Sequence, residues 1–165
     1  FKMAETLAVT DMLPNKFEPK RKFRWVFQLE GVDAFLMKTA NRPTFTFEEA
    51  KLDYINSFRY LAGKMTFNEL ELTLYDPIAP SGAQQVMEWI RTHYESVSAR
   101  AGYADFYKRD CQLKLLDPVG TVVELWDIKG AFIKSANYQD LDYAATNEPV
   151  AITLSLRFDN CVLQF

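Results

Sequence analysis

The chain has 165 residues, of which 48% are hydrophobic and 15% are aromatic. This composition indicates one packed globular domain and excludes an intrinsically disordered protein. The net charge of −3 argues against a protein that grips nucleic acid through its phosphates, because such a protein needs a basic surface.

The start of the chain carries no signal-peptide pattern, and no stretch approaches the roughly 18–20 apolar residues of a membrane span. The sequence begins with Phe1 rather than Met, as expected if a short leader is missing or trimmed. Residues 1–22 include Pro14 and Pro19 and lack an apolar face of their own. They predict an extended N-terminal arm in front of a single domain over residues 23–165.

Two strand-like runs open this domain. Trp25, Phe27 and Leu29 alternate with more polar neighbours, and the apolar run 35–37 follows the turn at Glu30-Gly31. The pattern predicts that these two strands pair with each other as a β-hairpin.

Apolar and polar residues alternate again in the next segment, part of which we expect to project from the domain. Phe45 and Phe47 alternate with threonines, which predicts a strand, and residues 56–63 have the composition of a polar, aromatic loop. We expect residues 47–63 to form a projecting hairpin or an extended loop. Its exposed aromatic side chains are unfavourable in water and are typical of an interface.

A second alternating run follows. Leu70, Leu72 and Leu74 share one face of the expected strand, and Glu69, Glu71 and Thr73 share the other. Met65 and Phe67 have the opposite parity, so one continuous strand through all of them requires a bulge near Asn68.

One helix is expected, over residues 81–99. Its apolar stripe has helical spacing, Ser81 is the expected N-cap, and Gly102 falls just past the end. The stripe consists of Val86, Trp89, Ile90, His93, Tyr94 and Val97.

Three further strand signals complete the chain, at residues 111–117, 121–136 and 150–160, with a turn at Asp117–Gly120 between the first two. Strands therefore dominate. The order predicts a mainly β protein, an antiparallel β-sandwich or barrel-like subunit with one flanking α-helix and an extended hairpin loop.

The Gly63-Lys64 pair matches only two residues of a phosphate-binding loop motif. Such a loop needs several glycines and then a Lys-Ser/Thr pair at the start of a helix, whereas a strand follows here. We therefore interpret Gly63 as a hinge and Lys64 as the start of a strand.

Other chemistry finds little support in the sequence. The single histidine, His93, lies in the helix stripe with no nucleophile elbow in the chain, and neither cysteine has a catalytic base nearby in sequence. Cys111 and Cys161 lack the spacing of a zinc site, so we expect no metal, no cofactor and no enzymatic activity. The two cysteines are expected either as reduced thiols or as a disulfide within or between subunits.

Two binding or catalytic alternatives stay open. The tryptophans and tyrosines allow a carbohydrate-binding β-sandwich, although core packing explains the tryptophans more simply. The carboxylates allow a glycosidase pair from separate strands, although alternating carboxylates are typical of a solvated sheet face.

Four short motifs, in order along the chain, resemble the tail-tube proteins of contractile-tailed bacteriophages. The resemblance spans residues 23–160, with the helix in the corresponding place. The motifs are Ala62-Gly63 with Phe67, Lys129-Gly130 with Phe132-Ile133, Leu141-Asp142-Tyr143, and Phe158-Asp159.

The resemblance implies a virion structural protein of the tail, assembled in the cytoplasm of the bacterial host. Its hexameric rings stack into the inner tube, whose bore is a β-barrel shared by all subunits and conducts DNA into the host. The implied partners are other copies of the chain, the sheath, baseplate and tail-terminator proteins, the tape measure protein, and the transiting DNA. The alternatives within the family are a baseplate protein that initiates the tube and the inner tube of a tail-derived injection particle.

Two groups of residues receive roles in this interpretation. A bore that passes DNA should be acidic or neutral, because a lysine-rich wall would bind phosphates. The residues expected to line it are Glu69, Glu71 and Thr73, together with Glu48 and Asp53. The expected contacts between subunits or rings are Tyr54, Phe58, Tyr60 and Leu61 in the projecting segment and Met12 and Leu13 in the arm.

Overall fold

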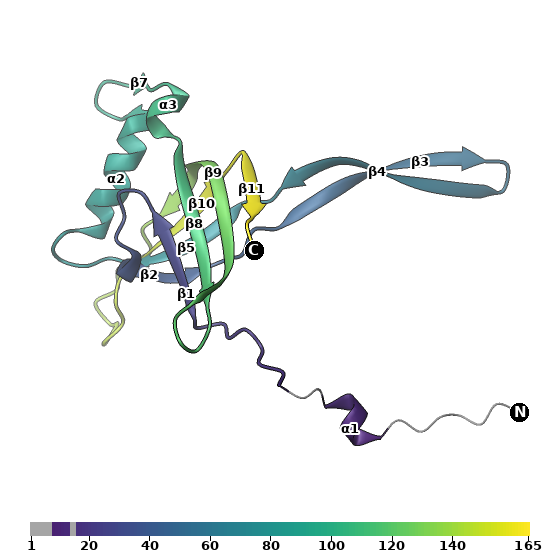
Figure 1. The fold of residues 1–165 in the computed structure, drawn as a ribbon. Coiled ribbons are helices and arrows are strands. Elements are labelled where there is room, and N and C mark those ends of the chain that lie inside the picture. The colour runs from purple at the N-terminus through teal and green to yellow at the C-terminus, as the bar shows by residue number, and fades with distance from the viewer. Residues whose placement is uncertain (1–7, 14–15) are drawn as a thin grey trace, which may run out of the picture.

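The computed structural model describes residues 8–13 and 16–165 (Figure 1). Residues 1–7 and 14–15 of the expected N-terminal arm lie outside the described residues. Within the described arm the backbone forms a short helix, α1 (Val9–Met12), where the sequence predicts an extended chain. The remaining elements are β1 (Trp25–Leu29), the 3-10 helix η1 (Ala34–Leu36), β2 (Met37–Ala40), β3 (Phe45–Tyr54), β4 (Ser57–Phe67), β5 (Leu70–Tyr75), α2 (Gly82–His93), β6 (Tyr94–Glu95), β7 (Arg100–Ala101), α3 (Ala104–Tyr107), β8 (Arg109–Leu116), β9 (Val122–Asn137), β10 (Ala151–Arg157) and β11 (Asn160–Leu163).

The main sheet is antiparallel and folds over on itself through β9. Its strand order is β1-β8-β9-β10-β5-β2, with β11 also paired to β9. The first half of β9 pairs with β8 and β11, and the second half pairs with β10. Between the halves, Gly130 has φ +69°, and a Cβ at this position would overlap the Asp159 carboxylate. The long strand therefore changes layer at a position that favours glycine.

The two layers enclose one core. The first layer contains β1, β8, the start of β9 and β11, and the second contains the end of β9, β10, β5 and β2. Alternate residues of each strand point inward, so Phe27 and Leu113 of the first layer share a core with Leu72 and Leu154 of the second. The mainly β, antiparallel, sandwich-like fold predicted from the alternation is confirmed.

Helix α2 packs on the core through Val86 and Trp89, as its stripe predicts. The Trp89 indole N–H donates a hydrogen bond to the Tyr107 carbonyl oxygen at 2.7 Å. The helix ends at His93 rather than at residue 99, so that part of the prediction is wrong. The chain turns through the small β6–β7 ribbon, and Val97 of the expected stripe is 94% exposed.

Ser81 occupies the expected N-cap position, directly before the first helical residue. Ser81 makes no side-chain capping bond. Asp76, at the end of the preceding segment, accepts a hydrogen bond from the backbone N–H of Ala83 at 3.2 Å instead. The turn between Asp76 and the helix brings this aspartate back to the first helical turn. Its carboxylate satisfies a free backbone N–H group there, in place of a capping bond from the Ser81 side chain.

The hairpin expected at Glu30-Gly31 is wrong as well. β1 pairs with β8 and β2 pairs with β5, so the consecutive strands lie in different layers. The segment around residue 35 forms η1 rather than a strand. Both strands alternate as predicted, but their partners come from distant parts of the chain, which periodicity does not reveal.

The stretch from residue 57 to residue 75 contains two strands. β4 pairs with β3 in a two-stranded hairpin, and β5 belongs to the main sheet. The apolar alternation changes phase near Asn68 because one strand ends and another begins there, and not because of a bulge within one strand. At that break the Asn68 N–H donates to the Thr44 carbonyl oxygen at 2.9 Å, which closes the root of the hairpin.

Candidate assembly surfaces

The β3–β4 hairpin extends away from the sandwich (Figure 1). The segment expected to be a loop at residues 56–63 is mostly the strand β4, and the predicted projecting hairpin is present. Of the expected contact residues in this segment, Tyr54 is 59% exposed, Phe58 56%, Tyr60 58% and Leu61 44%. Isolated two-stranded ribbons are marginal in water, and this one exposes large apolar side chains along its length. The hairpin therefore has the character of a surface that is buried in an assembly.

Gly63 is not a hinge before a strand, because it lies inside β4. The pairing passes from Phe47–Met65 to Glu49–Ala62, so Gly63 and Lys64 together oppose the single residue Glu48. A Cβ on Gly63 would lie 2.7 Å from the Glu48 carbonyl oxygen. The pair forms a β-bulge, and the glycine permits the close approach of the two backbones.

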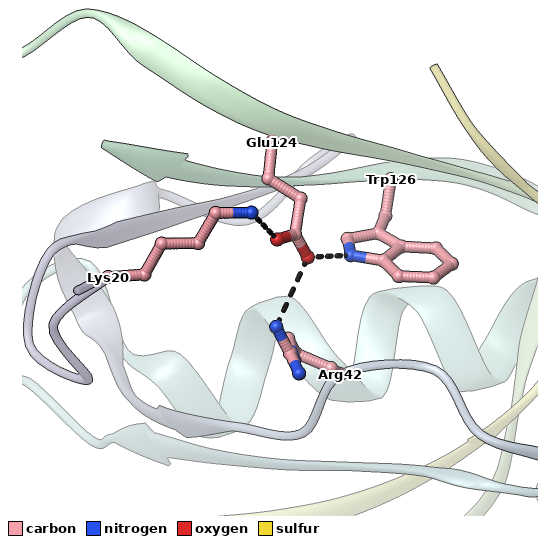
Figure 2. A network of polar contacts seen from close by, with 4 residues as sticks. All are labelled: Lys20, Arg42, Glu124 and Trp126. Atoms are coloured by element: carbon pink, nitrogen blue, oxygen red, sulfur yellow. Dashed lines mark hydrogen bonds and ion pairs between the residues drawn. The ribbon is translucent and has the colours of Figure 1, made fainter. Parts of the chain in front are cut away.

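A buried carboxylate joins the arm, the hairpin root and the sandwich (Figure 2). The Glu124 side chain, on β9, is only 6% exposed. It pairs with Lys20 from the arm and with Arg42, which precedes β3 and lies 3.4 Å away, and it accepts a hydrogen bond from the Trp126 indole N–H. We call these four residues the Glu124 cluster. Because its cations come from the arm and the hairpin root, the cluster fixes where both segments leave the domain.

The charge state of this carboxylate follows from its neighbours. Burial alone would raise the pKa of Glu124, but the hydrogen bonds from Lys20 and Trp126 and the charge of Arg42 lower the pKa overall. Glu124 is therefore ionised at neutral pH and available for both cations. Sequence reasoning missed this cluster, since its members lie far apart in the chain. The only available signal was a glutamate in phase with the apolar face of a strand.

The outer surface of the second layer is polar, as predicted for β5. Glu71 pairs across strands with Ser155, and Thr73 pairs with Thr153. Glu69 lies beside them, where the Ser155 hydroxyl donates to its carboxylate at 2.8 Å.

Cations also lie on this polar face. Lys134 forms an ion pair with Glu69, and the Arg157 charge acts on the same carboxylate. The hydrogen bonds from Lys134 and Ser155 lower the pKa of Glu69. The face is therefore balanced in charge around Glu69 rather than purely acidic.

The structure does not bring the remaining expected bore residues to this face. Glu48 and Asp53 lie on β3 in the projecting hairpin, away from β5. Asp53 is within 3.6 Å of Lys51 on the same strand. Their place in a bore stays a prediction about an assembly.

Met12 and Leu13 of the arm are 69% and 67% exposed. Their expected contact with a neighbouring copy likewise stays a prediction. The arm leaves the sandwich at Lys20, a member of the Glu124 cluster.

Both cysteines are free. Cys111 on β8 and Cys161 on β11 pair with the same residue, Ile128, from opposite sides of β9. Two strand spacings, roughly 9–10 Å, separate them, which is too far for a disulfide. A disulfide between Cys111 and Cys161 of one subunit is therefore wrong, and a disulfide between subunits stays a prediction.

Other expected chemistry leaves few traces in the described part of the chain. His93 is exposed and lies edge-on to the Tyr107 ring, with 4.3 Å between centroids. Residues 8–13 and 16–165 contain no group of three or more His, Cys, Asp or Glu side chains that could hold a metal ion. None of the helices among these residues has the length and apolar character needed to cross a membrane.

Comparison with known proteins gives matches by structure. No family model matches the chain, and no curated protein sequence matches it significantly. A chain in the cryo-EM structure of the anti-feeding prophage cap, described as the tube terminating cap, has a TM-score of 0.73 and 19% identity, covering 96% of this chain and 99% of that one. A chain in the sheath/tube terminator of PVC, an extracellular contractile injection system in its extended state, has a TM-score of 0.73 and 16% identity, covering 91% and 99%. A chain in the six-fold symmetrised anti-feeding prophage baseplate has a TM-score of 0.68 and 17% identity, covering 89% and 96%. At these identities the likeness establishes a common fold over nearly the whole length of both chains.

Proposed function

We propose that this chain, which has the fold of subunits found in the tube-terminator and baseplate assemblies of contractile injection systems, is a non-catalytic, ring-forming component of an inner tube. One observation carries the proposal: a sandwich with free edge strands bears a long apolar hairpin that no other part of the described chain covers. A structural neighbour from a six-fold symmetrised assembly supports hexameric rings. Head-to-tail stacking of such rings produces a tube.

The sheet borders support assembly. β1 and β2 are the two ends of the main strand order, so each presents one edge with no strand partner in residues 8–13 and 16–165. Edge strands are a hazard for soluble proteins unless they are covered or paired. Neighbouring copies in a ring would cover these edges.

The polar face of the second layer supports an inner wall. We place Glu69, Glu71 and Thr73 on the bore, together with Ser155 and Thr153. Ser155 and Thr153 are uncharged and Lys134 neutralises Glu69, so a wall built from this face would have little affinity for either sign of charge. Such a wall suits passage of cargo better than retention of it.

The hairpin and the arm are the proposed contacts between rings or subunits. Tyr54, Phe58, Tyr60 and Leu61 supply rigid apolar anchors on the hairpin. Met12 and Leu13 supply apolar contacts on the arm. The Glu124 cluster would set the angles at which both segments reach a neighbour.

The neighbours named above favour an injection particle over a DNA-conducting phage tail, because their descriptions name injection systems and an anti-feeding prophage. A tube-initiating role at the baseplate is a second candidate, favoured by the baseplate match. Under each candidate the partners are further copies of this chain, a sheath and a baseplate. If the particle is a DNA-conducting phage tail, the further partners are a tail-terminator protein, a tape measure protein and transiting DNA. The protein is then part of a virion assembled in the bacterial cytoplasm.

Negative-stain electron microscopy of the purified protein tests the proposal. Six-fold rings or hollow tubes at high protein concentration are the expected result. Rings that stack only after a baseplate extract is added would favour the initiator role. A monomer at all concentrations that binds glycans on an array would overturn the proposal in favour of a carbohydrate-binding sandwich.

A further inference from the structure

A groove opens between the two edge strands β1 and β2, beside the root of the β3–β4 hairpin. Its volume is about 1030 Å³, and its lining includes the apolar side chains of Trp25, Leu113 and Leu115. Lys22 and Lys38 also line it, and no carboxylate among the described residues lies within ion-pair distance of either. The groove therefore combines apolar surface with positive charge that the subunit itself does not neutralise.

The loop between β9 and β10, residues 138–150, has complementary chemistry. It carries Asp140, Asp142 and Glu148 and contains no lysine or arginine. Leu141 is 83% exposed and Tyr143 is fully exposed. Both apolar side chains thus sit in water between acidic neighbours.

This acidic loop is held in shape by its own hydrogen bonds. The Asp142 carboxylate accepts from the Ala144 N–H at 2.9 Å, and the Asn137 side chain accepts from the Gln139 N–H at 2.9 Å. A loop already ordered loses less conformational entropy when it binds. The high exposure of Leu141 and Tyr143 in a loop that makes its own hydrogen bonds points to a partner outside the subunit.

The groove runs along the edge strand β2. It borders Glu69, just before β5 begins, and reaches Lys38, whose ammonium lies 5.6 Å from the centroid of the Tyr75 ring at the end of β5. The acidic loop leads into Ala151, which pairs with Tyr75, so the loop leaves the sandwich at the Lys38 end of the groove. In Figure 1 the loop lies at the lower left, at the end opposite the projecting hairpin. Because Leu141 and Tyr143 are exposed, the loop does not occupy the groove of its own subunit, which leaves the groove accessible to the loop of a second copy.

We propose that the acidic loop of one copy inserts into the groove of a second copy in the assembly, an inference that rests on the proposed function. Leu141 and Tyr143 pack against Trp25 and Leu115. Asp140 and Asp142 face Lys22 and Lys38.

The hairpin fits the groove less well than the acidic loop does. Residues 45–67 carry three acidic side chains (Glu48, Glu49 and Asp53) and three basic ones (Lys51, Arg59 and Lys64), so the hairpin offers no net charge to a positive groove. The acidic loop is charged in the required sense, and opposite charges across a contact fix register as well as partner.

Charge reversal on each side tests the contact. Asp140→Lys/Asp142→Lys changes the loop, and Lys22→Glu/Lys38→Glu changes the groove without touching the Glu124 cluster. Each double variant should raise the critical concentration for tube formation at least about tenfold, because like charges then face each other. The quadruple variant should recover most of the loss. Sedimentation and electron microscopy at low and high salt measure the critical concentration. The control is Glu88→Lys/Asp105→Lys on α2 and α3, which changes the net charge by the same amount as the loop variant.

The outcomes separate the two proposals. If wild-type tubes form and neither reversal alters their critical concentration, the contact is wrong and the tube function stands. If each reversal acts but the quadruple variant shows no recovery, the two sites do not face each other and the contact is wrong. If the wild-type chain forms neither rings nor tubes, the proposed function fails, and this contact fails with it.

Discussion

At the scale of single residues, Glu124 shows how a charge can be kept inside a small β-domain. Its side chain is 6% exposed, while those of Lys20 and Arg42 are 50% and 60% exposed. The anion is therefore buried and the cations stay partly hydrated. This arrangement limits the desolvation penalty, which in a fully buried pair can exceed the Coulombic gain. The cluster thus tethers two projecting segments at modest energetic cost.

Glu124→Gln should lower the free energy of unfolding by about 1–2 kcal/mol, since it removes a charged acceptor while the cations can still bind water. The folded state depresses the pKa of Glu124, so this carboxylate stabilises the protein above its ordinary pKa of 4.5 and the contribution is lost as pH falls through the lower, folded value. The variant should therefore lose less stability than the wild type in that acidic range. Urea denaturation at pH 7 and at pH 3 measures both effects.

The matched control for this prediction is Glu71→Gln. Glu71 is exposed and forms no ion pair among the described residues. It should change the stability by less than about 0.5 kcal/mol at either pH. Equal losses in the two variants would contradict the role assigned to the Glu124 cluster.

At the scale of elements, the β3–β4 hairpin is the part of the molecule least supported by its own chain. Both strands are exposed over almost their whole length, apart from the half-buried Phe67 at the root. Phe67 packs against Phe158 of the sandwich, with 5.4 Å between ring centroids. The root is therefore fixed by the core, and the rest of the hairpin contributes little to the stability of the domain.

Gly63→Ala tests the bulge. The added methyl group would lie 2.7 Å from the Glu48 carbonyl oxygen, so the two strands must separate or slip in register. Tube formation should decline while the free energy of unfolding changes by less than about 1 kcal/mol, because the change is confined to the hairpin. Ala62→Ser, at the adjacent position, should preserve both properties.

Phe58→Ala/Tyr60→Ala tests the apolar surface of the hairpin. Both side chains are more than half exposed, so their removal should leave a folded subunit. The subunit should fail to form tubes, because the anchors of the contact are gone. Circular dichroism and electron microscopy supply the two readouts.

Tyr103→Ala/Phe106→Ala is the corresponding control. Tyr103 is the N-cap of α3 and Phe106 lies on that helix; both rings are exposed and α3 is distant from the hairpin. This variant should still polymerise. Tubes of normal length from the Phe58/Tyr60 variant would show that the hairpin is not the contact between rings.

At the scale of the whole molecule, the sheet is closed on one side and open on the other. β9 links the two layers, while β1 and β2 leave the opposite border unpaired with the groove between them. The subunit thus has a complete apolar core but incomplete hydrogen bonding at its border. Its stability should depend on assembly, because any contact made only by the folded state shifts the unfolding equilibrium.

The thermal midpoint of the wild-type protein should therefore rise with protein concentration above the polymerisation threshold. A tenfold increase should add about 1.4 kcal/mol per subunit, or roughly 3–6 °C. The assembly-deficient Phe58→Ala/Tyr60→Ala variant should show a midpoint independent of concentration. Differential scanning calorimetry across a hundredfold range of concentration distinguishes the two behaviours.

The sequence by itself determined the fold class, the strands with strict alternation and the apolar face of α2. These depend on neighbours in the chain: Leu70, Leu72 and Leu74 alternate, and Val86 and Trp89 follow the helical repeat. It also indicated the projecting hairpin, since that segment exposes more aromatic surface than one subunit can cover.

Only the tertiary structure decided which strands pair, where α2 ends and what surrounds Glu124. β1 and β2 are consecutive yet pair with β8 and β5, and the tip of the expected helix turns into a ribbon instead. The Glu124 cluster joins residues separated by 82 and 104 positions. Periodicity reports the environment of each side chain but not the identity of a distant partner, and all three features depend on that identity.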